Sequence, residues 1–91
     1  MKSKSTSLAL FFKEKPTKVL LTIFESKHAL YASSLAKKIR YTYTYINEVL
    51  HAMEQSGIIV FEKHGRLKLL VLTQKGKKIA EEVQSAVLHN S

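Results

Sequence analysis

The chain has 91 residues, enough for one domain, and 45% of them are apolar, so a hydrophobic core is expected but a deep pocket is not. Fifteen Lys and Arg residues against seven Asp and Glu residues give a formal net charge of +8 and a pI of about 9.8, which is typical of a protein with a polyanionic partner. Because there is no cysteine, disulfides, thiolate catalysis and cysteine-bound zinc are excluded.

The N-terminal stretch divides into a polar, basic segment and a short apolar run. We interpret residues 1–7 as a flexible basic arm and residues 8–91 as a single domain. The apolar run at residues 8–12 is shorter than the about 7–15 residues of a secretory signal core, and no stretch has the about 18 apolar residues of a membrane span. We therefore expect a cytoplasmic protein with no membrane segment.

Apolar residues at the spacing of one helical face predict two helices in the first half of the domain. The first covers about residues 16–26, with Pro16 in its first turn, where a missing N–H costs nothing. A very short strand is expected at residues 29–31, and Ser33 or Ser34 then serves as the N-cap of the second helix. Two lysines lie on the outer side of that second helix, Lys37 and Lys38.

A third helix is predicted over residues 42–56. Thr42 is a good N-cap, and Gly57 can take the left-handed conformation that ends a helix. Its inner stripe repeats with helical spacing and consists of Ile46, Val49, Leu50 and Met53. The opposite face carries Thr44, Asn47, Glu48 and His51, with Tyr43 at its leading edge. These side chains can pair with the edges of bases, since Asn can grip adenine, Glu can accept from cytosine and Thr can bond several bases.

The second half of the chain predicts a β-hairpin and a last helix. Residues 58–63 and 66–73 are apolar, β-prone runs on either side of a His64-Gly65 turn, and Thr73 then caps a helix over residues 74–88. Both faces of this hairpin are apolar, so one face needs a cover, which is either a second copy of the chain or residues 8–12. We predict a homodimer that uses the narrow apolar stripe of the last helix, Ile79, Val83 and Val87.

Together these elements resemble the winged helix-turn-helix of DNA-binding regulators, particularly MarR-like ones. The resemblance lies in LAKKIRYTYTYINEVLHAMEQSGII (residues 35–59) and in VLTQKGKKIAEEV (residues 71–83), where an L-T-x-x-G run closes the wing. It implies an α+β fold of three helices, a two-stranded wing and a C-terminal helix. Here Arg40 and Tyr41 stand where the family usually has Gly and Ile. The chain is also shorter than full-length MarR-like regulators, so control by a small-molecule effector is not expected.

The function implied is that of a sequence-specific transcriptional regulator bound to double-stranded DNA. The resemblance places residues 42–56 in the major groove as recognition helix and residues 63–68, the wing, near the minor groove, whose negative potential attracts Arg and Lys. Arg40 is expected to contact a phosphate. The predicted DNA-contact residues are Lys37, Lys38, Arg40, Thr42, Tyr43, Thr44, Asn47, Glu48, His51, Lys63, His64, Arg66 and Lys68.

Two other functions remain open from the sequence: a winged-helix protein-interaction module, and a basic architectural DNA-binding protein with little sequence preference. Catalysis, metal and cofactors are not expected. The four histidines are too far apart for two of them to share a helix face, and no nucleophile set or Gly-rich phosphate loop is present.

Overall fold

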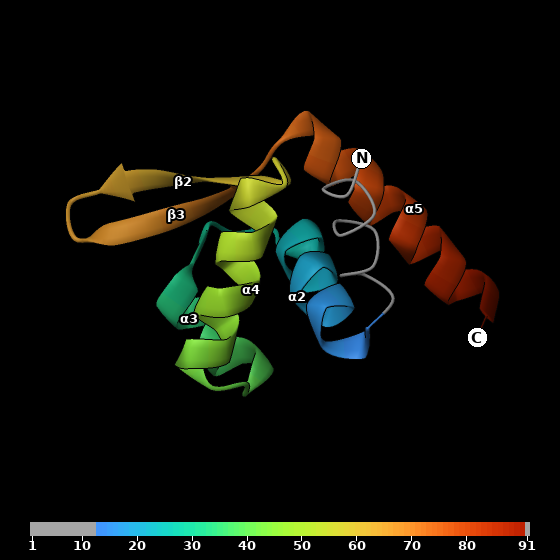
Figure 1. Ribbon diagram of the computed structural model, residues 1–91, viewed down its shortest axis with the longest axis horizontal. Helices are drawn as coiled ribbons and strands as arrows, with labels where there is room; N and C mark the ends of the chain where they lie inside the picture. Colours follow the sequence, from blue (N-terminus) through green and yellow to red (C-terminus); the bar gives the residue numbers. More distant parts are fainter. Residues whose placement is uncertain (1–12, 91) are drawn as a thin grey trace.

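The computed structural model describes residues 13–90, with side chains as far as Val87. The predicted basic arm and the apolar run at residues 8–12 lie outside the described residues. The elements follow the order α2 (Glu14–Glu25), β1 (Leu30–Tyr31), α3 (Ala32–Ile39), α4 (Tyr43–Gln55), β2 (Ile59–His64), β3 (Leu67–Leu72) and α5 (Gln74–Asn90). In Figure 1 the β2–β3 hairpin projects away from the helices, and α2 lies between α4 and α5. This is the architecture of a winged helix-turn-helix, as predicted.

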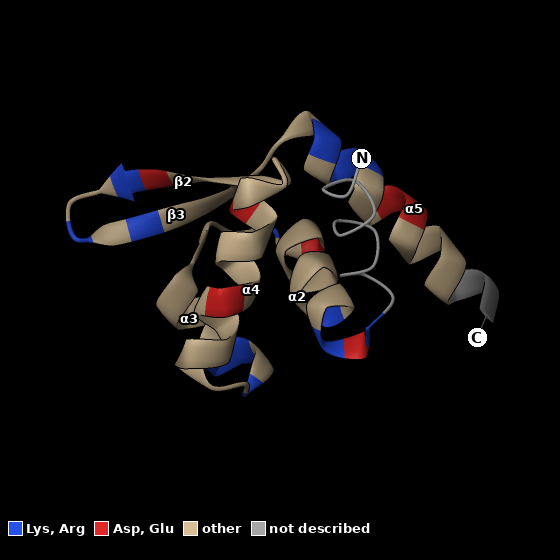
Figure 2. Cartoon of the chain, in the orientation of Figure 1, with Lys and Arg blue, Asp and Glu red and all other residues tan. Residues whose placement is uncertain are grey.

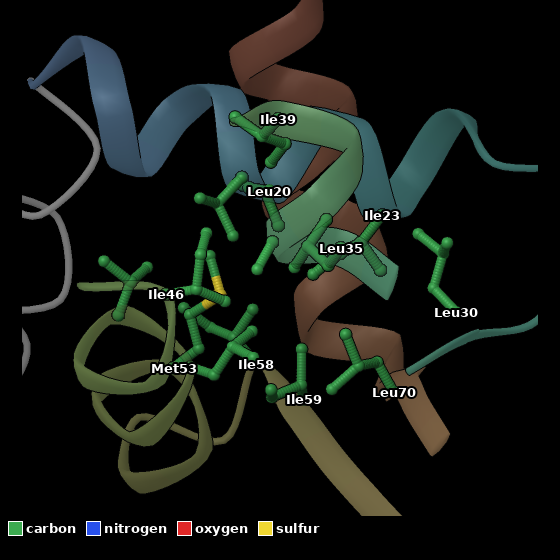
Figure 3. Packing of buried hydrophobic residues seen from close by; sticks show 14 of the residues in the cluster. Leu20, Ile23, Leu30, Leu35, Ile39, Ile46, Met53, Ile58, Ile59 and Leu70 are labelled. Atoms are coloured by element: carbon green, nitrogen blue, oxygen red, sulfur yellow. The ribbon is translucent and has the colours of Figure 1, made fainter. Parts of the chain in front are cut away.

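One hydrophobic core joins the helices to the base of the hairpin. The inner stripe predicted for the third helix is buried along α4, where Ile46, Leu50 and Met53 are fully inaccessible to solvent. Leu20 from α2 and Leu35 from α3 meet it, as Figure 3 shows. Because burying a large aliphatic side chain contributes about 1.5–3 kcal/mol, this packing fixes the angle at which α4 crosses α3 and α2.

The sheet has three strands in the order β1-β3-β2, all antiparallel, so the wing is larger than the predicted hairpin. The short strand expected at residues 29–31 forms and pairs with β3 through Leu30 and Leu70. Residues directly opposite one another share a face, and Ile59 pairs with Leu72 on the face that meets the core. The predicted second apolar face remains partly open, because Val60 and Leu67 are 44% and 46% exposed.

The helix starts agree with the sequence at two positions and differ at two others. The Thr42 hydroxyl accepts the Tyr45 backbone N–H at 3.1 Å, which confirms the cap of α4. Helix α2 starts at Glu14 rather than residue 16, so Pro16 lies at its third position but still in its first turn. The N-cap predicted for the second helix was wrong in position, because α3 starts at Ala32 and its N-cap is Tyr31. Ser34 still takes part in the cap, since its hydroxyl accepts the backbone N–H of Tyr31 at 3.0 Å from inside the first turn.

A compact junction ties α4 to α5. The Thr73 hydroxyl donates to the Gly57 carbonyl at 2.6 Å and accepts the Gly76 N–H at 3.0 Å, confirming Thr73 as a cap. The Lys75 ammonium donates to the Ser56 carbonyl at 2.8 Å. A Cβ at Gly76 would lie 2.0 Å from the carbonyl oxygen of Ile58, so only glycine lets the two backbones come this close.

Candidate nucleic-acid interface

The outer face of α4 is exposed and polar along its length. Tyr43 is 53% exposed, and the side chains of Thr44, Glu48 and His51 are also exposed, whereas Asn47 is half-buried. The first turn of α4 contains no acidic residue, so the positive end of the helix dipole is unscreened there. This face can therefore offer hydrogen-bonding groups to a partner that carries negative charge.

A groove lies between α4 and the wing. It has a volume of about 190 Å³, smaller than the about 300–1,000 Å³ of ligand pockets, so it suits the edge of a larger partner better than an enclosed small molecule. Its walls combine three predicted contact residues of α4 with two cationic residues of the wing. These five are Tyr43, Asn47, His51, Arg66 and Lys68. Tyr31, Ser33 and Phe61, which were not among the predicted contact residues, complete much of the lining.

Phe61 holds the two walls of this groove together. Its ring lies 6.1 Å from the ring of His51 on α4, and the ammonium of Lys68 lies 5.6 Å from its centroid. A cation over an aromatic face is attracted by the ring quadrupole, and partial burial of Phe61 strengthens that attraction. Phe61 therefore places a lysine of the wing beside the outer face of α4. Only the tertiary structure reveals this role, because in the sequence Phe61 is simply one residue of an apolar, β-prone run.

Positive charge is concentrated in the wing, where it lowers the stability of the sheet. Lys63 and Lys68 are directly opposite one another across β2 and β3, where like charges destabilise a sheet. Arg66 is exposed at the tip, beside Gly65 with a φ of 63°. His64 Nε2 lies 3.2 Å from Glu62 Oε1, so the tip's carboxylate is directed toward the histidine. A polyanion bound at the wing would relieve the repulsion between the two lysines.

A second group of cations lies at the end of α3. Lys37 and Lys38 are exposed in its last turn, where the helix dipole favours positive charge. Arg40 follows with a φ of 69°, and among the described residues it is the only non-glycine with positive φ. Glycine adopts this left-handed conformation most readily, so the arginine is strained there. Figure 2 shows these basic residues gathered at the turn between α3 and α4, away from the wing.

The sequence missed a cluster on the other side of α4. The rings of Tyr41 and Tyr45 meet edge to face at 5.8 Å, and the Lys15 ammonium lies 5.5 and 5.6 Å from their centroids. Burial raises the pKa of the Tyr45 hydroxyl above its ordinary value, with smaller contributions from Tyr41 and from the Glu48 carboxylate. The cluster joins the first turn of α2 to the first turn of α4.

The stripe predicted for dimerisation is divided between the chain's own core and the surface. Ile79 and Val83 pack in part against the core, and Val87 is 46% exposed.

In the described part of the chain no three His, Asp or Glu side chains are grouped so that they could hold a metal ion. No helix among residues 13–90 has the length and apolar character needed to cross a membrane.

No protein-family model matches the sequence. The sequence is 30% identical over 83 residues to an uncharacterized protein of Archaeoglobus fulgidus, covering 88% of this chain and 87% of that protein. The crystal structure of AF1382 from Archaeoglobus fulgidus superposes with a TM-score of 0.79 at 30% identity, covering 89% of this chain and 92% of that one. The fold is also similar to that of MepR, a transcription regulator of the Staphylococcus aureus multidrug efflux pump MepA. That comparison gives a TM-score of 0.76 at 19% identity over 92% of this chain and 66% of MepR. These comparisons confirm the predicted fold.

Proposed function

We propose that this chain, which belongs to the same family as the uncharacterized Archaeoglobus fulgidus protein, is a MarR-like, sequence-specific transcriptional regulator that binds double-stranded DNA. In this proposal α4 enters the major groove and the wing approaches the adjacent minor groove. The chemistry of DNA requires both a cationic surface for phosphates and neutral or acidic hydrogen-bonding groups for base edges. The region around α4 supplies both.

The observation that carries the proposal is the groove between α4 and the wing. Asn47 and His51 on one wall face the cations Arg66 and Lys68 on the other, so base-reading and charge-neutralising groups converge on one concave surface. The opposed pair of Lys63 and Lys68 supports it, because such a pair costs stability in the free protein.

The contacts divide into readers and positioners. We assign base contacts to the outer face of α4: Asn47 pairs with adenine, and Glu48 accepts a hydrogen bond from cytosine. Phosphate contacts come from Lys37, Lys38 and Arg40, while Lys63, Arg66 and Lys68 approach the minor groove. Thr42, Tyr43, Thr44, His51 and His64 complete the proposed interface.

A titration of labelled duplex DNA at several salt concentrations tests the proposal. Affinity should fall by about three to five orders of magnitude between about 50 and 200 mM salt if about 6–10 phosphates are neutralised. Selection of bound sequences from a random duplex pool should then enrich one motif. An absence of binding at low salt would instead favour a protein-interaction module, while binding without an enriched motif would favour an architectural protein.

A matched pair of variants separates readers from positioners. Asn47→Ala should cost about 1–3 kcal/mol on the selected site with little loss on random DNA, because a base contact is removed. Lys37→Ala should weaken binding to both DNAs by similar factors, because a phosphate contact carries no sequence information. Equal losses on both DNAs for Asn47→Ala would contradict the assignment of Asn47 as a reader.

We further propose that the protein acts as a homodimer through α5. Val87 is 46% exposed, and Ile79 and Val83 are only partly covered within the chain. Val83→Glu combined with Val87→Glu should give monomers, because like charges would be desolvated at the interface. Sedimentation at micromolar concentration, with circular dichroism as the control for folding, measures this. A wild-type protein that is monomeric both alone and on DNA would exclude the dimer.

A further inference from the structure

The outer face of α4 has two flanks, and they meet different parts of the molecule. Successive residues of an α-helix are rotated by about 100°, which places Tyr45 about 160° around the axis from Asn47. Asn47 lines the groove with the wing, whereas Tyr45 contacts α2 through Lys15. One flank of α4 is therefore bounded by the wing and the other by the first turn of α2.

Lys15 is held on this second flank by specific contacts. Its side chain is exposed, yet the ammonium lies within 5.6 Å of two tyrosine rings that brace each other edge to face. The first turn of a helix disfavours positive charge, because the helix dipole is positive there. The aromatic cluster thus stabilises a cation at an unfavourable place in α2 and fixes it beside the start of α4.

The geometry points to Lys15 as a phosphate-binding residue, and this inference rests on the proposed function. We propose that Lys15 contacts a DNA phosphate on the flank of α4 opposite the wing. A helix about 10–12 Å in diameter fills a major groove about 12 Å wide, so phosphates of the two strands lie along its two flanks. The wing supplies cations to one strand, and Lys15, together with Arg40, supplies them to the other. The interface would then extend beyond the helix-turn-helix to α2.

The test compares Lys15→Gln with Lys78→Gln, a loss of the same charge on the exposed surface of α5. Figure 2 shows the basic first turns of α5 at the far end of the molecule from the α3–α4 turn. Lys15→Gln should reduce the slope of log affinity against log salt by about 0.9, the value for one phosphate, and weaken binding to selected and random duplexes equally. Lys78→Gln should leave the slope of wild type, and Lys15→Arg should restore most of the affinity.

Duplexes that carry a single neutral methylphosphonate locate the contact. One backbone position should weaken wild type but have no further effect on Lys15→Gln, and it should lie across the groove from the position sensitive to Lys68→Gln. If wild type binds and Lys15→Gln keeps the wild-type slope while its melting temperature falls, Lys15 is only structural and the inference is overturned. If wild type itself binds no DNA, the proposed function fails, and this inference fails with it.

Discussion

Gly76→Ala tests whether the junction between α4 and α5 depends on the close approach of two backbones. The new Cβ would be built 2.0 Å from the Ile58 carbonyl oxygen and 3.1 Å from Ile58 Cγ2. Since ordinary contacts begin near 3.4 Å, the start of α5 must move away from Ile58 by more than an ångström. That carbonyl also accepts the Thr73 backbone N–H at 3.0 Å, so the displacement strains this hydrogen bond as well.

The size of the effect follows from three contributions. Overpacking costs about 1–3 kcal/mol, and a weakened hydrogen bond adds about 1 kcal/mol. Alanine in place of glycine inside a helix recovers about 1 kcal/mol. The variant should therefore be less stable than wild type by about 1–3 kcal/mol, which lowers the melting temperature by about 4–8 °C for each kcal/mol in a domain of this size.

Thermal and denaturant unfolding followed by circular dichroism measure this loss. Gln74→Ala, an exposed change in the same turn of α5, is the matched control and should remain within about 0.5 kcal/mol of wild type. Gly65→Ala meets no atom within 4 Å and should cost only the strain of its positive φ, about 1–2 kcal/mol. A Gly76→Ala protein as stable as the Gln74→Ala control would refute the reasoning, because the backbones could then separate without penalty.

Three further changes test individual features of the interface. Arg40→Gly removes a side chain from a φ of 69° and should raise the free energy of unfolding by up to about 1 kcal/mol, measured in denaturant. The lost charge should at the same time lower the affinity for DNA. A destabilised variant would contradict this reasoning. Thr42→Ala deletes the cap that holds the Tyr45 N–H and should cost about 0.5–2 kcal/mol, with Thr42→Ser close to wild type; equal losses in both would show that the cap contributes nothing. Because the folded-state pKa of Tyr45 is raised, its contribution to stability is complete below the ordinary value of 10.0 and is lost as pH rises through the folded pKa. Tyr45→Phe should therefore lose less stability than wild type as the pH rises above 10.0, and parallel curves of stability against pH would refute the assignment.

Local periodicity was sufficient to predict the elements that position the interface. The stripe of Ile46, Leu50 and Met53 is buried as expected, because a helical face toward the core repeats within a few residues of sequence. Thr42 and Gly57 were recognisable for the same reason, since caps act on backbone groups only a few residues away.

Features that depend on contacts between distant residues were not predicted. Lys15 precedes Tyr41 and Tyr45 by 26 and 30 residues, so no local pattern relates them. The role of Phe61 beside His51 likewise depends on how the base of the wing packs against α4. The pattern of the hairpin predicted two apolar faces but could not show that β1 pairs with β3 as a third strand at one edge of the sheet. The start of α3 was misplaced because Ser34 caps from inside the helix instead of before it.

The hydrogen bonds that Thr73 and Lys75 make to the end of α4 have a consequence for operator length. In the proposed dimer these hydrogen bonds make α4, which reads the bases, and α5, which forms the dimer, move as one rigid body. Inserting one base pair between the half-sites of a palindrome would turn one of them by about 34–36° around the DNA axis, given about 10–10.5 base pairs per turn. Because α4 cannot rotate relative to α5, it cannot follow that rotation of the half-site. The protein should therefore measure the spacing of its half-sites as strictly as it reads their bases.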